Sequence, residues 1–368
     1  MSEQSYILAP ATVSVSFSLA PVDNINNSLM IMLQGYDLSG LGEWPGQIFS
    51  RLSPEQRHTH DMVFNVMLWA LMMEPSPATY PAYLEQLARQ DAEKARDEVL
   101  KMLVMACAQN DVETTAEALL AADEDTYMDI IRRGIAPKYA EKGMTFEPAT
   151  FSDVLPLLQD PPAMMAVIVD HLRYMWQVHC KTEWERNLPT LREVIAAFEQ
   201  MDYNGLTALE AIRSVTGRDV SGLWPDIERV HELVFVPSMH VGPYLTYFEI
   251  DRDPTRFTVI FGARMPRGGG QESPALSRSD LLVRLSALAD DTRLSILELL
   301  VANETLCAQE IMTRLNLSQS SASRHLRQLT ATGYLVERRR EVAKCYSLNA
   351  DRVDDTLQAL QRFFRRSS

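Results

Sequence analysis

The chain has 368 residues, of which 46% are hydrophobic and 23% charged, and its formal net charge is −14. This is the composition of an ordinary globular protein, and the length suits two or three domains. No apolar run approaches the length of a membrane span, which argues against a transmembrane protein.

The first residues and the cysteines indicate a compartment. The stretch from Met1 to Ser5 lacks the basic flank of a signal peptide. The four cysteines, Cys107, Cys180, Cys307 and Cys345, lie far apart and form no CxxC pair. We therefore expect a cytoplasmic protein whose cysteines are reduced and form no disulfide framework.

The first two thirds of the chain predict a mostly helical body. Residues 12–19 alternate between apolar and polar side chains, which predicts a half-buried strand. Ser53, Pro54 and Gln56 form a strong helix start, with a capping serine, proline at the first helical position and glutamine three residues after the cap. Helices are expected near residues 27–34, 53–73, 78–89, 92–109, 112–133, 151–159, 163–184, 188–200 and 206–215.

The pattern changes to strands after the last of these helices. Residues 232–236, 244–250 and 256–263 are strand-like, and residues 251–255 form a clear turn between the last two. We expect three antiparallel strands, joined by the strand at residues 12–19. Residues 1–265 are therefore predicted to form one α+β domain, mostly helical with a small antiparallel sheet.

A linker and a change of charge mark a domain boundary. Residues 266–276 are rich in Gly and Pro, as linkers are. Residues 275–368 contain 14 Lys and Arg and 11 Asp and Glu, a net charge of +3, whereas the rest contains 21 and 38, a net charge of −17. Because charge is screened over about 8 Å at physiological salt, the basic part can attract phosphates despite its acidic neighbour.

The last part of the chain has the pattern of a helix-turn-helix. Residues 308–315 and 317–329 are helical and are joined by a short turn, and Ser318 can cap the second helix. Ala322, Leu326 and Leu329 form one apolar stripe, so the polar face opposite is left for DNA. A stop signal at Gly333 precedes a hairpin with a basic tip, which predicts a wing.

Three ordered segments resemble the ArsR family of winged helix-turn-helix regulators: residues 285–297 (LSALADDTRLSIL), 317–326 (LSQSSASRHL) and 333–336 (GYLV). The resemblance covers about residues 277–366, so we take 277–368 as a winged helix-turn-helix DNA-binding domain. It implies a transcriptional regulator, expected to be a repressor, whose recognition helix enters the major groove of a near-palindromic operator. In the family the first and last helices of this domain pair two subunits, which implies a homodimer.

The recognition helix and the wing supply the expected DNA-binding residues. The recognition helix would read bases with Gln319, Ser320, Ser323 and Arg324, and His325 and Arg327 would lie nearer the DNA backbone. The wing would contact phosphates or the minor groove with Arg338, Arg339, Arg340 and Lys344. Ser318 and Ser321, in the first turn of the helix, complete the set.

The two metal sites known in the family are incomplete here. Where many members carry a CxC pair, this chain has Cys307 and Gln309, and one thiolate cannot build a site for a soft metal. The other family site uses Asp and His on the last helix, and residues 351–366 contain no His. We expect no metal site and no cofactor, and a core position for Cys307; a redox pairing of Cys307 with Cys345 is the less favoured alternative.

The role of residues 1–265 stays open. Signatures such as GxSxG, GxxxxGK[ST] and HExxH are absent, so we expect no enzyme and no catalytic residues. The alternative is that this domain is an enzyme or a small-molecule-binding module with the winged helix as an adaptor. The best candidate lining for an effector pocket is Trp69, Tyr174, Met175 and Trp176, although core packing is the more common role of such residues.

Overall fold

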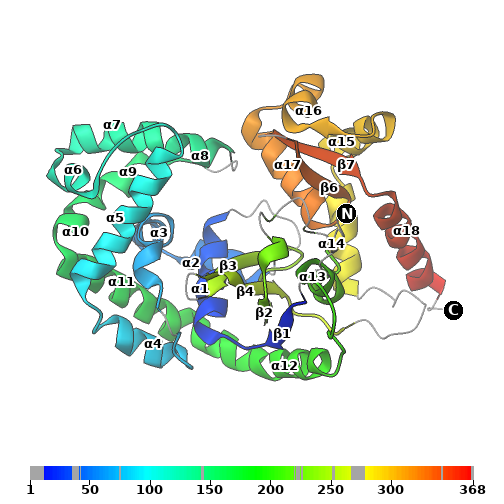
Figure 1. Ribbon diagram of the computed structural model, residues 1–368, viewed down its shortest axis with the longest axis horizontal. Helices are drawn as coiled ribbons and strands as arrows, with labels where there is room; N and C mark the ends of the chain where they lie inside the picture. Colours follow the sequence, from blue (N-terminus) through cyan, green and yellow to red (C-terminus); the bar gives the residue numbers. More distant parts are fainter. Residues whose placement is uncertain are drawn as a thin grey trace, which may run out of the picture.

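The structure is a computed structural model that describes residues 12–34, 41, 43–73, 76–141, 145–218, 220, 224, 227–250, 253–266, 278–340 and 343–365. The described residues form an N-terminal body with a helical lobe and a sheet, and a C-terminal head (Figure 1). No described helix is long and apolar enough to cross a membrane. The predicted linker falls almost wholly on residues 267–277, outside the described residues.

The elements of the N-terminal body lie in this order: β1 (Ser14–Phe17), α1 (Pro21–Ile31), α2 (Glu43–Arg51), α3 (Pro54–Asp61), η2 (Met62–Val66), η3 (Leu68–Leu71), α4 (Tyr80–Leu87), α5 (Ala92–Ala108), α6 (Ala116–Ala121), α7 (Glu124–Gly134), α8 (Ala136–Glu141), α9 (Pro148–Ser152), α10 (Leu155–Gln159), α11 (Pro161–Met175), η4 (Trp176–Cys180), α12 (Lys181–Glu199), α13 (Ala208–Thr216), β2 (Glu232–Ser238), β3 (Thr246–Ile250) and β4 (Asp253–Gly262). The head then has α14 (Arg278–Leu288), α15 (Asp291–Ala302), β5 (Leu306–Cys307), α16 (Ala308–Leu315), α17 (Gln319–Ala331), β6 (Leu335–Arg340), β7 (Ala343–Leu348) and α18 (Ala350–Arg365).

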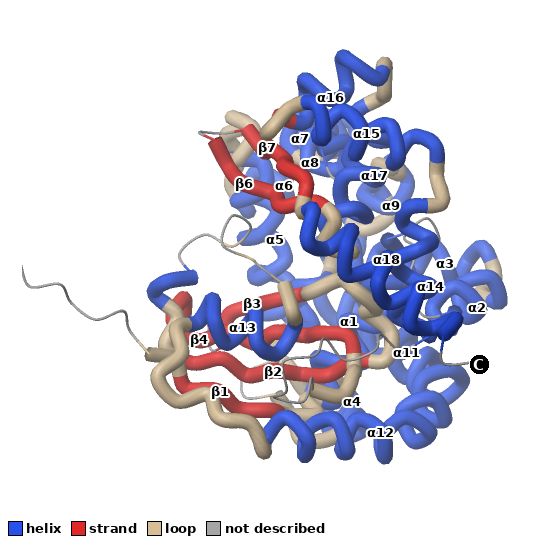
Figure 2. The backbone as a smooth tube through the Cα atoms, turned by 90° about the vertical axis from the view of Figure 1, so that its right-hand side faces the viewer, coloured by secondary structure: helices blue, strands red, loops and turns tan. Residues whose placement is uncertain are grey.

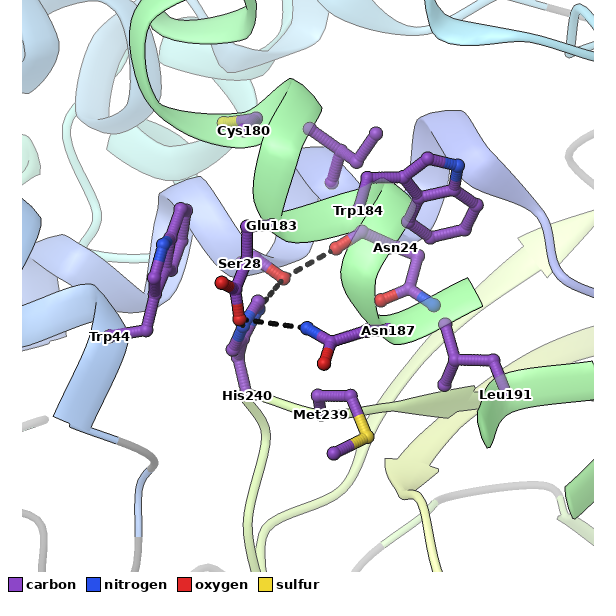
Figure 3. Close-up of a pocket in the computed structure, with 11 residues that line it drawn as sticks. Asn24, Ser28, Trp44, Cys180, Glu183, Trp184, Asn187, Leu191, Met239 and His240 are labelled. Atoms are coloured by element: carbon purple, nitrogen blue, oxygen red, sulfur yellow. Dashed lines mark hydrogen bonds and ion pairs between the residues drawn. The ribbon is translucent and has the colours of Figure 1, made fainter. Parts of the chain in front are cut away.

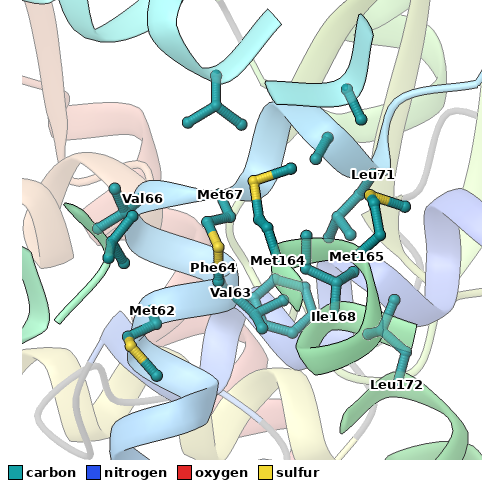
Figure 4. Packing of buried hydrophobic residues seen from close by; sticks show 14 of the residues in the cluster. Met62, Val63, Phe64, Val66, Met67, Leu71, Met164, Met165, Ile168 and Leu172 are labelled. Atoms are coloured by element: carbon teal, nitrogen blue, oxygen red, sulfur yellow. The ribbon is translucent and has the colours of Figure 1, made fainter. Parts of the chain in front are cut away.

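The helical lobe forms around one large apolar core. Its centre is the segment after α3, where Val63 and Met67 pack with no exposed surface against Ile168 of α11 (Figure 4). Ser53 caps α3 as expected: its hydroxyl accepts from the Gln56 N–H, and the Gln56 side chain accepts from the Ser53 N–H. The helix predicted over residues 53–73 continues as the π-helical turn η2 and the 3₁₀ turn η3, so the regular α-helix ends at Asp61.

The two helices predicted over residues 163–184 and 188–200 are one continuous helical stretch. The π-helical turn η4 connects α11 to α12, and α12 continues through Pro189 to Glu199. A proline inside a helix costs one backbone hydrogen bond. The packing of Leu191, Val194 and Phe198 of the same helix, which are nearly fully buried, outweighs that cost.

The sheet of the body is mixed. Its strand order is β1-β2-β4-β3, and β3 and β4 form the antiparallel hairpin that the sequence predicts. However, β2 runs parallel to both β1 and β4, so the expectation of an antiparallel pairing for these strands is wrong. The chain from β1 to β2 passes through the helical lobe, and this long crossover permits the parallel pairing (Figure 2).

The head has the α+β arrangement that the sequence predicts. The three strands lie in the order β5-β7-β6, all antiparallel, and β6 and β7 form the wing. A core of its own, which includes Ile296, Ile311 and Leu329, connects α15, α16 and α17 to the sheet. The fold class is therefore confirmed: a mostly helical α+β body followed by a winged helix-turn-helix.

Candidate DNA-binding site

Local sequence signals fix the turn between α16 and α17. Asn316 ends α16 in the left-handed conformation, with a φ of 51°, which asparagine tolerates better than most residues. Ser318 is the N-cap of α17, and its hydroxyl accepts a hydrogen bond from the Ser321 N–H at 3.3 Å. The two helices therefore pack at a short fixed turn, and α17 begins at Gln319, the residue after the predicted cap.

A buried arginine holds the recognition helix α17 against α15. The Arg293 guanidinium donates to the Ser286 and Ala287 carbonyls at 2.9 and 2.6 Å and to the Gln328 side chain at 3.0 Å. Asp290, which caps α15, also lies near this guanidinium. Because Gln328 belongs to α17, the orientation of the recognition helix depends on this hydrogen-bonded group.

The outer face of α17 carries the residues that the sequence assigns to base reading. Gln319, Ser320 and Arg324 are exposed, and Ser323 is half-buried. Ser318 is exposed as well, but its hydroxyl accepts the capping bond. Ser321 is half-buried beside the turn. These placements agree with a polar face turned away from the head's core, although DNA contact by any of these residues stays a prediction.

Two predicted contacts on α17 are placed differently. His325 is only 7% exposed and lies beside Asp290, at 3.5 Å from its carboxylate, so it faces the head's interior rather than DNA. Burial lowers the pKa of His325 below its usual range, with Asp290 opposing the shift. The Arg327 guanidinium lies over the Tyr244 ring, 5.9 Å from its centre. Arg327 therefore faces the N-terminal body in this arrangement.

The wing presents basic side chains near its tip. Arg338 and Arg340 of β6 are exposed, and Lys344 of β7 lies 3.6 Å from the Glu337 carboxylate. The side chain of Arg339 lies outside the described residues, and only its backbone pairing with Lys344 is described. Glu337 offsets the charge of Lys344, so Arg338 and Arg340 are the described wing residues best placed for phosphates.

The expectation that Cys307 and Cys345 are unpaired is wrong. They are directly opposite residues of β5 and β7, and a disulfide joins them. Cys107 and Cys180 are free and buried, as expected of core cysteines. The disulfide connects the start of α16 to the wing, and it leaves no thiolate on Cys307 for a metal. The described residues hold no cluster of three or more His, Cys, Asp or Glu side chains suited to a metal ion.

These features define a winged helix-turn-helix DNA-binding domain. Residues 290–336 match the family model described as bacterial regulatory protein, arsR family. The transcriptional activator HlyU of Vibrio cholerae is 36% identical over 83 residues, which are 23% of this chain and 76% of the relative. The arsenic resistance transcriptional regulator ArsR2 of Pseudomonas putida is 40% identical over 65 residues, 18% of this chain and 56% of that protein.

A likeness of the same extent is found among solved structures. The crystal structure of NolR from Sinorhizobium fredii is 32% identical, with a TM-score of 0.20, and the match covers 25% of this chain and 97% of that one. The chain belongs to the ArsR family through its C-terminal domain and is a DNA-binding transcriptional regulator. The family model covers residues 290–336, and the two relatives cover 23% and 18% of the chain, so these matches do not assign the N-terminal body.

A pocket in the N-terminal body is a second candidate site, and it differs from the one expected. Met175 is fully buried, Tyr174 and Trp176 pack against the large core, and Trp69 is 38% exposed. The described pocket instead lies between α1, α2, α12 and the β2–β3 loop (Figure 3). Its lining residues are Asn24, Ile25, Ser28, Trp44, Cys180, Glu183, Trp184, Asn187, Leu191, Met239 and His240. It encloses about 20 Å³, room for about one water molecule.

A hydrogen-bonded chain of Ser28, His240 and Glu183 forms one wall of this pocket. His240 Nδ1 lies 2.9 Å from Ser28 Oγ, and its Nε2 lies 3.2 Å from Glu183 Oε1. Hydrogen bonding by His240 holds the pKa of Glu183 near 2, against the opposing effect of burial. The Trp44 ring is stacked on the His240 ring, with centres 4.5 Å apart. No local pattern in the sequence indicates this group, because its members are far apart in the chain.

The arrangement differs from that of a catalytic triad. The Ser28 hydroxyl has one proton and already donates it to the Asn24 carbonyl at 2.8 Å. Because that proton is directed at Asn24, the Ser28 hydroxyl does not donate to His240 Nδ1, as the nucleophile of a triad does. This geometry therefore supports binding or structure rather than catalysis by an activated serine.

Proposed function

We propose that this regulator is a homodimeric repressor that binds a near-palindromic operator through α17 and the wing. The observation that carries the proposal is the polar outer face of α17, with Gln319, Ser320 and Arg324 exposed at the N-terminal end of a helix fixed by Arg293. Repression is the simplest consequence of a dimer that covers an operator. HlyU, by its name, is an activator. A promoter–reporter fusion with and without the gene decides the direction.

Replacing Arg324 with Ala tests the assignment of base reading. If its guanidinium reads a base, the substitution weakens specific binding by roughly 1–3 kcal/mol and relaxes sequence preference at one position. Arg338→Ala should weaken all sequences alike and reduce the salt slope by about one. Fluorescence anisotropy with operator and random duplexes at several salt concentrations measures both. Arg314→Ala, an exposed arginine of α16, is the control. Unchanged affinity and preference in Arg324→Ala would remove this residue from the reading face.

Exposed apolar residues on the first and last helices of the head support the homodimer. Leu282 of α14 is 58% exposed, and Leu357 and Phe364 of α18 are 49% and 66% exposed. The helices α14 and α18 pack against one another, and Tyr334 bonds to both through the Arg284 carbonyl and the Thr356 hydroxyl. The two helices therefore present neighbouring apolar surface that a second subunit can cover.

A charge on this surface should separate the subunits. We expect the double substitution of Leu357 and Phe364 by Asp to give a monomer in light scattering, since a buried unpaired carboxylate is costly. The monomer should lose most of its operator affinity, because each half-site, about 34–36 Å from the other, is then bound alone. Val301→Asp, at a 72% exposed position on α15, is the matched control. A wild-type monomer that binds one per operator contradicts the dimer.

The second candidate function is that the N-terminal body binds a small molecule as an effector. The pocket supports this reading over an enzyme, because the Ser28 hydroxyl donates to the Asn24 carbonyl and not to His240, so the group lacks the hydrogen bond of an activated nucleophile. The pocket must widen before it admits more than one water molecule, and the half-buried Trp44 and Trp184 border it. Native mass spectrometry of the purified protein tests this, since a retained ligand appears as added mass.

A further inference from the structure

The C-terminal end of the recognition helix is packed against the N-terminal body. Ala331, the last residue of α17, is 5% exposed and belongs to an apolar cluster whose other buried members come from the body, among them Val236, Val241 and Tyr244. Tyr244 is itself 8% exposed. The head and the β2–β3 region of the body therefore share a packed apolar interface.

Two arginines add polar contacts to this interface. Arg218, which follows α13, donates to the Pro243 carbonyl at 2.9 Å and also to the Ala331 carbonyl at the end of α17. Arg327 of α17 lies over the Tyr244 ring, as a cation–π contact does. One loop, residues 239–244, thus supports the recognition helix through Pro243 and Tyr244. We call Arg218, Tyr244 and their two contacts on α17 the clamp.

One helix of the helical lobe, α8, also lies close to the recognition helix. Cα atoms of α8 lie within 8 Å of Cα atoms of α17, and the two helices lie next to one another in Figure 1. Leu326 and Leu329 of α17 pack in the head's own core, so α8 lies against another side of this helix.

This approach conflicts with a helix bound in DNA. The major groove is about 12 Å wide and a helix with its side chains is about 10–12 Å across, so the groove has no room for a second helix beside α17. The rest of the chain is acidic: residues outside 275–368 hold 38 acidic and 21 basic side chains. The body therefore attracts the same basic surface of the head that DNA phosphates attract.

We propose that the described arrangement is a closed, DNA-excluding state of the protein, and that the clamp holds it closed. The inference rests on the proposed function, because it assumes that α17 enters the groove. For DNA to bind, the head must leave the body by separation at the clamp. The apparent affinity for DNA is then reduced by the fraction of molecules that are open, and loss of a clamp contact raises that fraction.

The test compares clamp variants with matched controls in the full-length protein. Tyr244→Leu keeps apolar volume in the cluster but removes the ring under Arg327, and Arg218→Gln removes the guanidinium that donates to the Ala331 carbonyl. The controls are Tyr203→Leu, a half-buried tyrosine that packs in the second core of the body, and Arg192→Gln, an exposed arginine of α12. A duplex of about 30 base pairs, selected with wild-type protein from a randomised pool, spans two half-sites. Small-angle scattering without DNA gives the radius of gyration.

The expected result is a larger radius of gyration without DNA for both clamp variants and about tenfold tighter binding to the duplex, with both controls like wild type. If the Tyr244→Leu protein folds and has the same radius of gyration and the same affinity for the duplex as wild type, the proposal is overturned. The Tyr244→Leu result alone is decisive in the event that Arg218→Gln does not fold. If neither the wild-type protein nor the clamp variants bind any duplex, the proposed function alone is refuted, because the scattering of the variants still decides whether the clamp holds the head. If scattering shows that the wild-type protein keeps the closed arrangement in its complex with DNA, the proposal that the clamp excludes DNA is wrong and the proposed function is not affected.

Discussion

Substitution of Arg293 by Ala is expected to destabilise the head by several kcal/mol, because each buried acceptor that loses its donor costs about 1–3 kcal/mol. The Arg293 guanidinium bonds to two carbonyls and to Gln328, and burial lowers its pKa below the ordinary value, with Asp290 opposing the shift. Without it, the Ser286 and Ala287 carbonyls and the Gln328 side chain lose their donor inside the head. Arg293→Lys should be intermediate, because an ammonium cannot reproduce the geometry of the guanidinium.

Calorimetry is the suitable measurement for this variant. All five tryptophans, at positions 44, 69, 176, 184 and 224, belong to the N-terminal body, so tryptophan fluorescence is insensitive to the head. We expect Arg293→Ala to lower the temperature at which the head unfolds. The temperature at which the tryptophan fluorescence of the N-terminal body changes should stay as in wild type. Arg314→Ala, at an exposed arginine that donates to the Asn303 side chain, is the control. A variant as stable as wild type would show that Arg293 does not hold α17.

The head was predictable because its signals are local. Ser318 as a cap and Gly333, with a φ of 84°, as a stop lie at the ends of α17, as the sequence predicts. A Cβ at Gly333 would lie 2.5 Å from the Arg352 side chain, which would have to move to make room for it. His325 could have been placed correctly too: it lies three residues after Ala322 and four before Leu329, within the buried stripe. The chemistry of a histidine favours a contact with DNA, whereas the spacing of His325 indicates the core.

The features that sequence could not give depend on distant pairings. Alternation along β1 indicates which residues are half-buried but not whether the strand runs parallel or antiparallel to β2. The disulfide arises because the register of β5 and β7 sets Cys307 opposite Cys345, 38 residues later. The packing of α17 against Tyr244 depends on how the head and the body are placed relative to one another. Neither helical periodicity nor charge predicts that placement.

A buried histidine pair should make the N-terminal body sensitive to acid. The Leu29 carbonyl can only accept, so His60 Nε2 carries the proton of that 3.0 Å bond and His60 Nδ1 accepts from His171 Nε2 at 2.9 Å. Both rings are then neutral. Burial lowers the pKa of His60 to about 4, and burial together with His60 lowers that of His171 to about 3.

The sign of the pH effect follows from these lowered values. A histidine whose pKa is lower in the folded state than in the unfolded chain, where it is about 6.5, stabilises fully above pH 6.5 and loses this contribution as pH falls toward 4. One such group is worth roughly 3 kcal/mol over that range, and the two are coupled, so their effects do not add. Asp23, whose pKa burial raises to about 6, acts in the opposite direction between its two pKa values.

The comparison of wild type with His60→Gln isolates the pair from Asp23 and the other acidic groups. Urea unfolding followed by tryptophan fluorescence reports the body, since all five tryptophans lie there. We expect His60→Gln to be less stable than wild type at pH 7.5, because a buried hydrogen-bonded ring is lost, and the difference to narrow by about 2–3 kcal/mol by pH 4.5. His58→Gln replaces a half-buried histidine of the same helix that lies outside the pair, beside Asp153, and serves as the control. If the free energies of unfolding of wild type and His60→Gln differ by the same amount at pH 7.5 and at pH 4.5, His60 is already protonated in the folded protein or water reaches the histidine pair.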